Sequence, residues 1–149
     1  MKTLIRILCV FIITTGGFLT ACSSRNSSGA GGSLQVKDAW ARPAPVGGTS
    51  AVYFVIENSG NSDTLLSASS SAAENTELHM SKMEGDTMLM QPQENVPLPA
   101  NEQVEFTPGG LHVMLIHLNV GLQPGDRLPV TLNFENAGNI QVEATVREP

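Results

Sequence analysis

The sequence contains few cysteines. Only Cys9 and Cys22 occur among 149 residues, and both precede residue 34. The body of the chain beyond that point therefore has no thiol, which excludes a disulfide framework and any metal site made of thiolates. It also excludes catalysis by a cysteine nucleophile.

Basic residues are scarce as well. Eight Lys and Arg stand against 14 Asp and Glu, giving a formal net charge of −6. Two of the basic residues are Lys2 and Arg6; without them, six basic residues remain against the same 14 acidic ones, a formal charge of −8. Such a surface repels phosphate backbones, so we expect no nucleic-acid partner. It also offers no electrostatic affinity for anionic lipid.

Long hydrophobic runs are limited to one segment, Ile7 to Leu19, which is 13 residues long. A helix needs about 20 such residues to span a bilayer, so this run is too short. Preceded by Lys2 and Arg6, it is typical of a secretory signal. It ends in Leu19-Thr20-Ala21-Cys22, which resembles a bacterial lipoprotein cleavage box.

That resemblance implies cleavage before Cys22 and lipidation of Cys22, which would anchor the protein to a membrane. The alternative is ordinary secretion with an unmodified Cys22. We therefore predict a signal peptide over residues 1–21, a Ser/Gly-rich tether over 22–33 and one domain over 34–149. The protein is expected in the cell envelope, lipid-anchored on the periplasmic or extracytoplasmic side.

The body consists of short apolar alternations separated by turn residues. Many short strands at this spacing predict an all-β antiparallel sandwich or barrel, and no stretch has a sustained helical period. The turn Glu84-Gly85-Asp86 predicts a hairpin. The expected strands are 34–37, 39–40, 51–56, 64–68, 76–80, 87–91, 103–106, 111–118, 128–134 and 140–146.

Histidine and methionine are concentrated in one part of the body. All three histidines, and every methionine except Met1, lie between His79 and His117. Methionine usually fills cores, but four of these residues flank the polar turn at Gly85, where a hydrophobic filler is not expected. They are Met80, Met83, Met88 and Met90.

The segment His112-Val113-Met114 places a histidine and a methionine on one face of a strand. Alternate residues of a strand project the same way, and their Cα atoms lie about 7 Å apart. His79 and Met90 occupy the two arms of the predicted hairpin. Thioether sulfur is soft and uncharged, so imidazole and thioether together suit Cu(I) and bind harder ions poorly. A thiol-free site also avoids thiol oxidation in an oxidising compartment.

These residues resemble the motif of the PCuAC domain of periplasmic copper chaperones. Its pattern is His, ten residues, Met, 21 residues and His-x-Met, and here it is met by His79, Met90, His112 and Met114. The flanking segments 38–43, 51–54 and 108–115 are also similar, and the likeness covers roughly residues 34–146. His117 departs from the usual pattern, and strand alternation turns it away from His112, so we interpret it as structural or exposed.

The resemblance implies a cupredoxin-like Greek-key fold that binds one Cu(I) per chain through those four ligands. It also implies delivery of copper for assembly of the dinuclear site of cytochrome c oxidase. The partners would be the copper subunit of that oxidase or a Sco-type protein. The protein would be a monomer and not an enzyme.

Several alternatives stay open at this point. Copper sequestration for tolerance needs the same ligands as delivery. A blue-copper electron carrier is excluded because it needs a cysteine thiolate. Met80, Met83 and Met88 are candidates for secondary ligands, for a surface that docks a partner, or for adaptable surface side chains. Trp40 is expected in the core or in the wall of the pocket.

Overall fold

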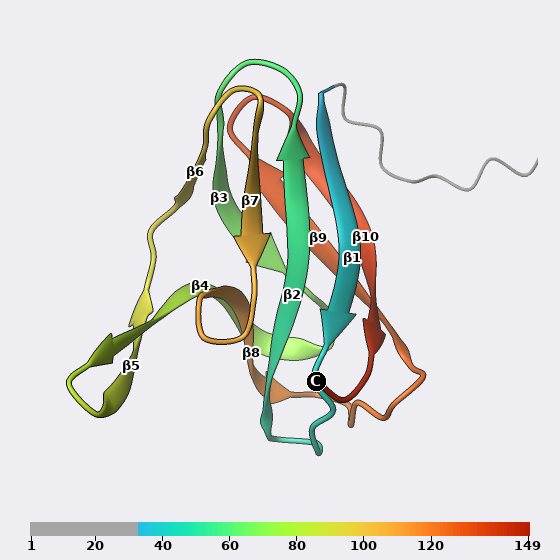
Figure 1. Ribbon diagram of the computed structural model, residues 1–149. Coiled ribbons are helices and arrows are strands. Elements are labelled where there is room, and N and C mark those ends of the chain that lie inside the picture. The colour runs from blue at the N-terminus through green and yellow to red at the C-terminus, as the bar shows by residue number, and fades with distance from the viewer. Residues whose placement is uncertain (1–32) are drawn as a thin grey trace, which may run out of the picture.

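The computed structural model describes residues 33–149, and in this range the chain is all β (Figure 1). The predicted signal peptide, the predicted tether up to residue 32 and the lipidation candidate Cys22 lie outside the described residues. None of the described residues forms a helix that could cross a bilayer. The strands are β1 (Leu34–Ala41), β2 (Thr49–Asn58), β3 (Asp63–Ser69), β4 (Ala73–Glu84), β5 (Thr87–Pro92), β6 (Val96–Leu98), β7 (Glu102–Phe106), β8 (Leu111–Leu118), β9 (Arg127–Phe134) and β10 (Gly138–Val146).

The strands join in the order β5-β4-β8-β7-β2-β1-β10-β9-β3-β6, and β8 also pairs with β2. Most pairs are antiparallel, but β1 runs parallel to β10 and β7 parallel to β8. Contacts of β3 with β4 and of β6 with β7 bring the two halves of the sheet together. This arrangement confirms the predicted single-domain, cupredoxin-like sandwich.

The core lies between the two halves and is filled by alternate residues of the strands. Phe54 of β2 stacks on Phe106 of β7 with ring centroids 4.3 Å apart. Both rings are fully buried, as is Phe134 of β9. Burial of side chains of this size stabilises the fold by about 1.5–3 kcal/mol each. Within residues 33–149, no methionine belongs to this core.

The expected strands match the observed ones with three differences. The strand expected over 76–80 is longer and runs from Ala73 to Glu84. The break expected after Lys37 is a β-bulge within one longer strand, where Asp38 has a φ of 53° and the register against β2 shifts. The strand β6 was not expected, because it has three residues and contains Pro97. It pairs with β3 at the edge of the sheet, where proline is tolerated.

The hairpin of β4 and β5 projects from the body of the molecule (Figure 1). The predicted turn connects the two strands, and Gly85 has a φ of 62°, a conformation that favours glycine. In the described part of the chain β5 pairs only with β4, and all six of its residues are exposed. The outer part of this hairpin therefore rests on cross-strand pairing and not on the core.

The Asp63 side chain of β3 is hydrogen-bonded to the turn between β9 and β10. Its Oδ1 accepts hydrogen bonds from the backbone N–H groups of Thr64 (2.7 Å) and Asn136 (2.9 Å), and its Oδ2 accepts one from Ala137 (2.9 Å). Burial alone would raise the pKa of this carboxyl group, but the backbone N–H donors outweigh burial and lower it.

We predict that Asp63→Asn lowers the free energy of unfolding by about 1–3 kcal/mol, because an amide replaces one accepting oxygen. The lowered pKa means that the ionised form stabilises the fold above about pH 4 and that this contribution is lost as the pH falls through the folded-state pKa. Urea unfolding at several pH values measures both effects. Glu102→Gln, at an exposed position, is the control. Equal decreases in the free energy of unfolding in the two variants would contradict this role of Asp63.

Candidate metal centre

Pairing between β4 and β8 brings the two predicted histidine ligands together. His79 lies directly opposite His112 in the antiparallel register, and their ring centroids are 5.8 Å apart. Both residues are buried, with exposed fractions of 9% and 3%. Two residues earlier on β4, Glu77 lies opposite Met114. Because β8 is regular between His112 and Met114, these two side chains share a face, as predicted.

His112 is oriented by the loop that precedes β8. Its Nδ1 lies 3.1 Å from the carbonyl oxygen of Gly110, which also accepts the backbone N–H of Ser81 at 3.0 Å. Because a carbonyl only accepts, Nδ1 carries the proton and Nε2 keeps a free lone pair. The neighbouring Gly109 has a φ of 84°, and the loop there can turn because this residue is glycine.

Burial lowers the pKa of His112, and the nearby His79 lowers it further, while the hydrogen bond to Gly110 acts in the opposite direction. The imidazole is therefore held neutral, which is the form that binds a metal ion. A free, neutral Nε2 is available for coordination without the loss of any hydrogen bond seen in the structure.

His79 has a complementary arrangement of its two ring nitrogens. Its Nε2 lies 2.8 Å from a carboxylate oxygen of Glu77. Its Nδ1 is buried and has no hydrogen-bond partner among residues 33–149. A carboxylate on one nitrogen and a free lone pair on the other is the common pattern of a histidine that binds a metal. Glu77 is not among the candidates predicted from the sequence, although its spacing of two residues from His79 places both side chains on one face of the strand.

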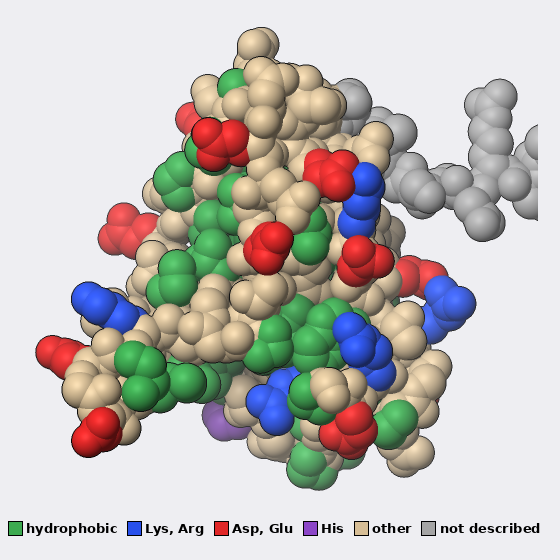
Figure 2. All heavy atoms as spheres, viewed as in Figure 1, with side chains coloured by type: hydrophobic (Ala, Val, Ile, Leu, Met, Phe, Trp, Pro, Cys, Tyr) green, Lys and Arg blue, Asp and Glu red, His purple; other side chains and the backbone are tan. Residues whose placement is uncertain are grey.

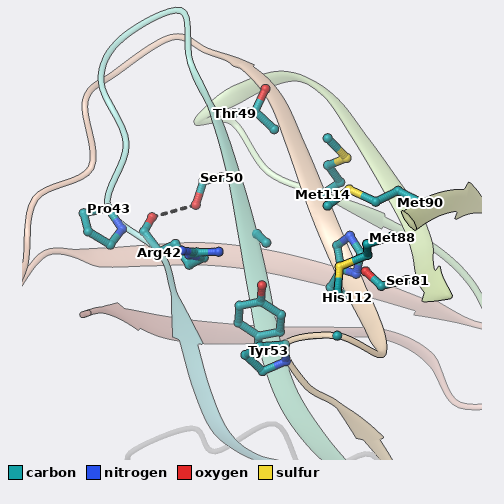
Figure 3. Close-up of a pocket in the computed structure, with 13 residues that line it drawn as sticks. Arg42, Pro43, Thr49, Ser50, Tyr53, Ser81, Met88, Met90, His112 and Met114 are labelled. Atoms are coloured by element: carbon teal, nitrogen blue, oxygen red, sulfur yellow. Dashed lines mark hydrogen bonds between the residues drawn. The ribbon is translucent and has the colours of Figure 1, made fainter. Parts of the chain in front are cut away.

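A pocket of about 380 Å³ opens beside His112. Met114, Met90 and Met88 converge on it from β8 and β5, whereas Arg42 and Tyr53 lie on its other side (Figure 3). The structure thus gathers three of the four predicted ligands around one space. The fourth, His79, does not line this pocket but lies against His112 at its edge.

Aromatic rings support the wall of the pocket. Tyr53 lies between His112 and Trp40, with ring centroids 6.3 Å from the first and 4.6 Å from the second. The guanidinium carbon of Arg147 lies 4.3 Å from the Trp40 ring centroid. Trp40 therefore packs against Tyr53, but it is only half-buried and belongs neither to the lining of the pocket nor to the buried core.

The remaining candidates divide between the two faces of the hairpin. Ser81 pairs with Met90 and Met83 with Met88, so these four residues share the face of His79. Met80 pairs with Gln91 on the opposite face, so the structure does not bring it to the pocket. His117 is exposed, and its Nδ1 lies 3.4 Å from a carboxylate oxygen of Glu74, in agreement with its expected position away from His112.

The donor set fits a soft metal ion. Within residues 33–149, no three His, Cys, Asp or Glu side chains are arranged to hold an ion. The donor atoms at this pocket are the imidazole nitrogen of His112 and the thioether sulfurs of Met88, Met90 and Met114, with the His79 imidazole beside His112. Such ligands add no charge to the ion and favour Cu(I) over Zn(II), Mg(II) or Ca(II).

Comparisons with known proteins agree with this fold. The chain is 31% identical over 117 residues to a protein of Leifsonia xyli subsp. xyli named "Putative lipoprotein Lxx21020", which covers 77% of this chain and 70% of that protein. Two solved structures with a TM-score of 0.66 are the copper-bound PCuAC domain from PmoF2, 26% identical, and the apo PCuAC domain from PmoF1, 27% identical. Each alignment covers 79% of this chain; it covers 95% of the PmoF2 domain and 96% of the PmoF1 domain.

A third solved structure is that of the Cu(I) form of DR1885 from Deinococcus radiodurans. It is 25% identical, has a TM-score of 0.56 and covers 82% of this chain and 85% of its own. The family described as "Putative lipoprotein LpqE-like" matches residues 34–146, which is nearly the whole described part. The chain therefore belongs to the LpqE-like lipoprotein family, and its domain has the fold of the PCuAC copper-binding domains.

Proposed function

We propose that this protein is an extracytoplasmic copper chaperone that binds one Cu(I) through His79, Met90, His112 and Met114. The observation that carries the proposal is the pairing of His79 with His112 at the edge of a pocket that Met90 and Met114 line. The free nitrogens of both imidazoles and the two thioether sulfurs supply four soft or borderline donors. The likeness to copper-bound PCuAC domains supports the same cargo.

The exposure of the ligands favours transport of the ion over storage. The histidines are buried, but Met90 is 55% exposed on an outer strand. A partner can therefore reach one thioether while the imidazoles still hold the ion. Four protein ligands leave no open position for a substrate, so we infer a binding protein and not an enzyme.

The recipient that we propose is the dinuclear copper site of cytochrome c oxidase, reached directly or with a Sco-type protein. Support comes from the resemblance of the motif to that of periplasmic copper chaperones. Lipid attachment at Cys22 would hold the domain close to a membrane-bound recipient, and membership of a family described as lipoproteins supports this anchoring.

A pair of matched variants tests the ligand assignment. Met114→Leu removes a thioether of the pocket and is expected to lower Cu(I) affinity, because leucine has a similar volume but no donor atom. Met80→Leu makes the same chemical change on the opposite face of the hairpin and is expected to leave the affinity unchanged. Competition with a Cu(I) chelator under anaerobic conditions measures both. Equal affinities in the two variants would remove Met114 from the ligand set.

The affinity for Cu(I) is expected to depend on pH only in acid. Protons compete with the metal for imidazole nitrogen, whereas thioether sulfur does not titrate in this range. Because burial lowers the pKa of His112, its protonation begins below the ordinary value of about 6.5. Affinity should therefore be constant above about pH 7 and fall on further acidification.

A chelator whose own proton binding is known allows this profile to be measured from about pH 5 to 9. Thiolate ligation would instead give affinity that still rises toward about pH 8.5, where free cysteine titrates. Constant affinity down to pH 5 would mean that methionines alone hold the ion.

A further inference from the structure

The outer half of the β4–β5 hairpin carries more thioether groups than one copper ion needs. Met83 and Met88 are directly paired across the two strands and are 56% and 53% exposed. Directly paired residues have Cβ atoms about 4.5–5.5 Å apart on the same face, so both sulfurs can reach one ion. Neither side chain packs into the core, which is the usual role of methionine.

Met88 also belongs to the pocket. It lines the same space as His112, Met90 and Met114, and Figure 3 shows its side chain beside the His112 ring. With Met88, five donors surround the centre, although Cu(I) with four ligands is already saturated. Met88 therefore connects the proposed metal centre to the tip of the hairpin.

The thioethers form a continuous series on one face. Met90 and Met88 are two residues apart on β5, about 7 Å by strand rise, and Met83 lies opposite Met88. Lys82 and Glu84 alternate with this series and project from the other face. Hydrophobic side chains follow the projecting arm, and charged ones surround its tip (Figure 2). The series thus leads from the buried histidines to the exposed outer end of the hairpin.

We propose that Met83 and Met88 form an outer Cu(I) site through which the ion enters and leaves the inner centre, with Met90 as a ligand common to both. This inference rests on the proposed binding of Cu(I) at the inner centre. Transfer is a ligand exchange in which a bond from copper to the Met88 sulfur forms as a bond to an inner ligand breaks. The ion stays Cu(I), and no proton or electron moves.

The outer site is tested on the full chain, anaerobically, with ¹³C in the methionine methyl groups and Cu(I) added in steps. The first equivalent should shift the methyl signals of Met90 and Met114, and that of Met88, which lines the same pocket. The second should shift that of Met83, while Met80 on the opposite face stays unchanged. A Met83 signal that does not respond at two equivalents would overturn the outer site. Unshifted Met90 and Met114 at one equivalent would contradict the proposed inner centre instead.

Transfer kinetics give an independent measurement. The double variant Met83→Leu/Met88→Leu should lose the second equivalent and release its first Cu(I) to a chelator more slowly than the unaltered chain. Met80→Leu is the matched control and should do neither. Because the replaced side chains are exposed and leucine has a similar volume, the hairpin is expected to fold in both variants. Release from the double variant at the rate of the control would overturn the transfer role.

Discussion

The pairing register of β4 with β8 is the constraint on which the site depends. In this register His79 lies opposite His112, and Glu77 opposite Met114. A slip of one residue would turn every side chain of β4 to the other face and separate the two imidazoles. The same strand continues into the hairpin, so its register also determines which methionines face the pocket. The hydrogen bonds from Ser81 and His112 to the Gly110 carbonyl oxygen hold the strands in this alignment.

The two kinds of proposed ligand differ in burial: the imidazoles are buried, whereas the thioethers of β5 are exposed. The imidazoles lie within the sheet, where desolvation keeps His112 neutral and backbone or carboxylate partners orient the rings. The thioethers of β5 lie on an edge strand that, within residues 33–149, pairs with β4 alone. Rigid nitrogen ligands with accessible sulfur ligands suit an ion that must be held selectively and then given to a partner.

The sequence was sufficient to predict most of the strands, the hairpin turn and the face shared by His112 and Met114. These follow from local alternation and turn chemistry, which the fold leaves intact. The parallel pairing of β1 with β10 and the pairing of His79 with His112 join distant segments, and periodicity alone carries no information about them. The position of Met88 in the pocket likewise depends on the packing of β5 near β8, which are distant in the sequence. The Cys22 assignment lies outside the described residues and stays a prediction.

The central claim is that one metal ion is held by both imidazole nitrogen and thioether sulfur. X-ray absorption at the copper edge of the protein loaded with one equivalent of Cu(I) tests this directly. We expect the copper ligands to include sulfur and nitrogen together, and Met114→Leu should reduce the sulfur content. Nitrogen and oxygen ligands alone, unchanged in that variant, would contradict this claim.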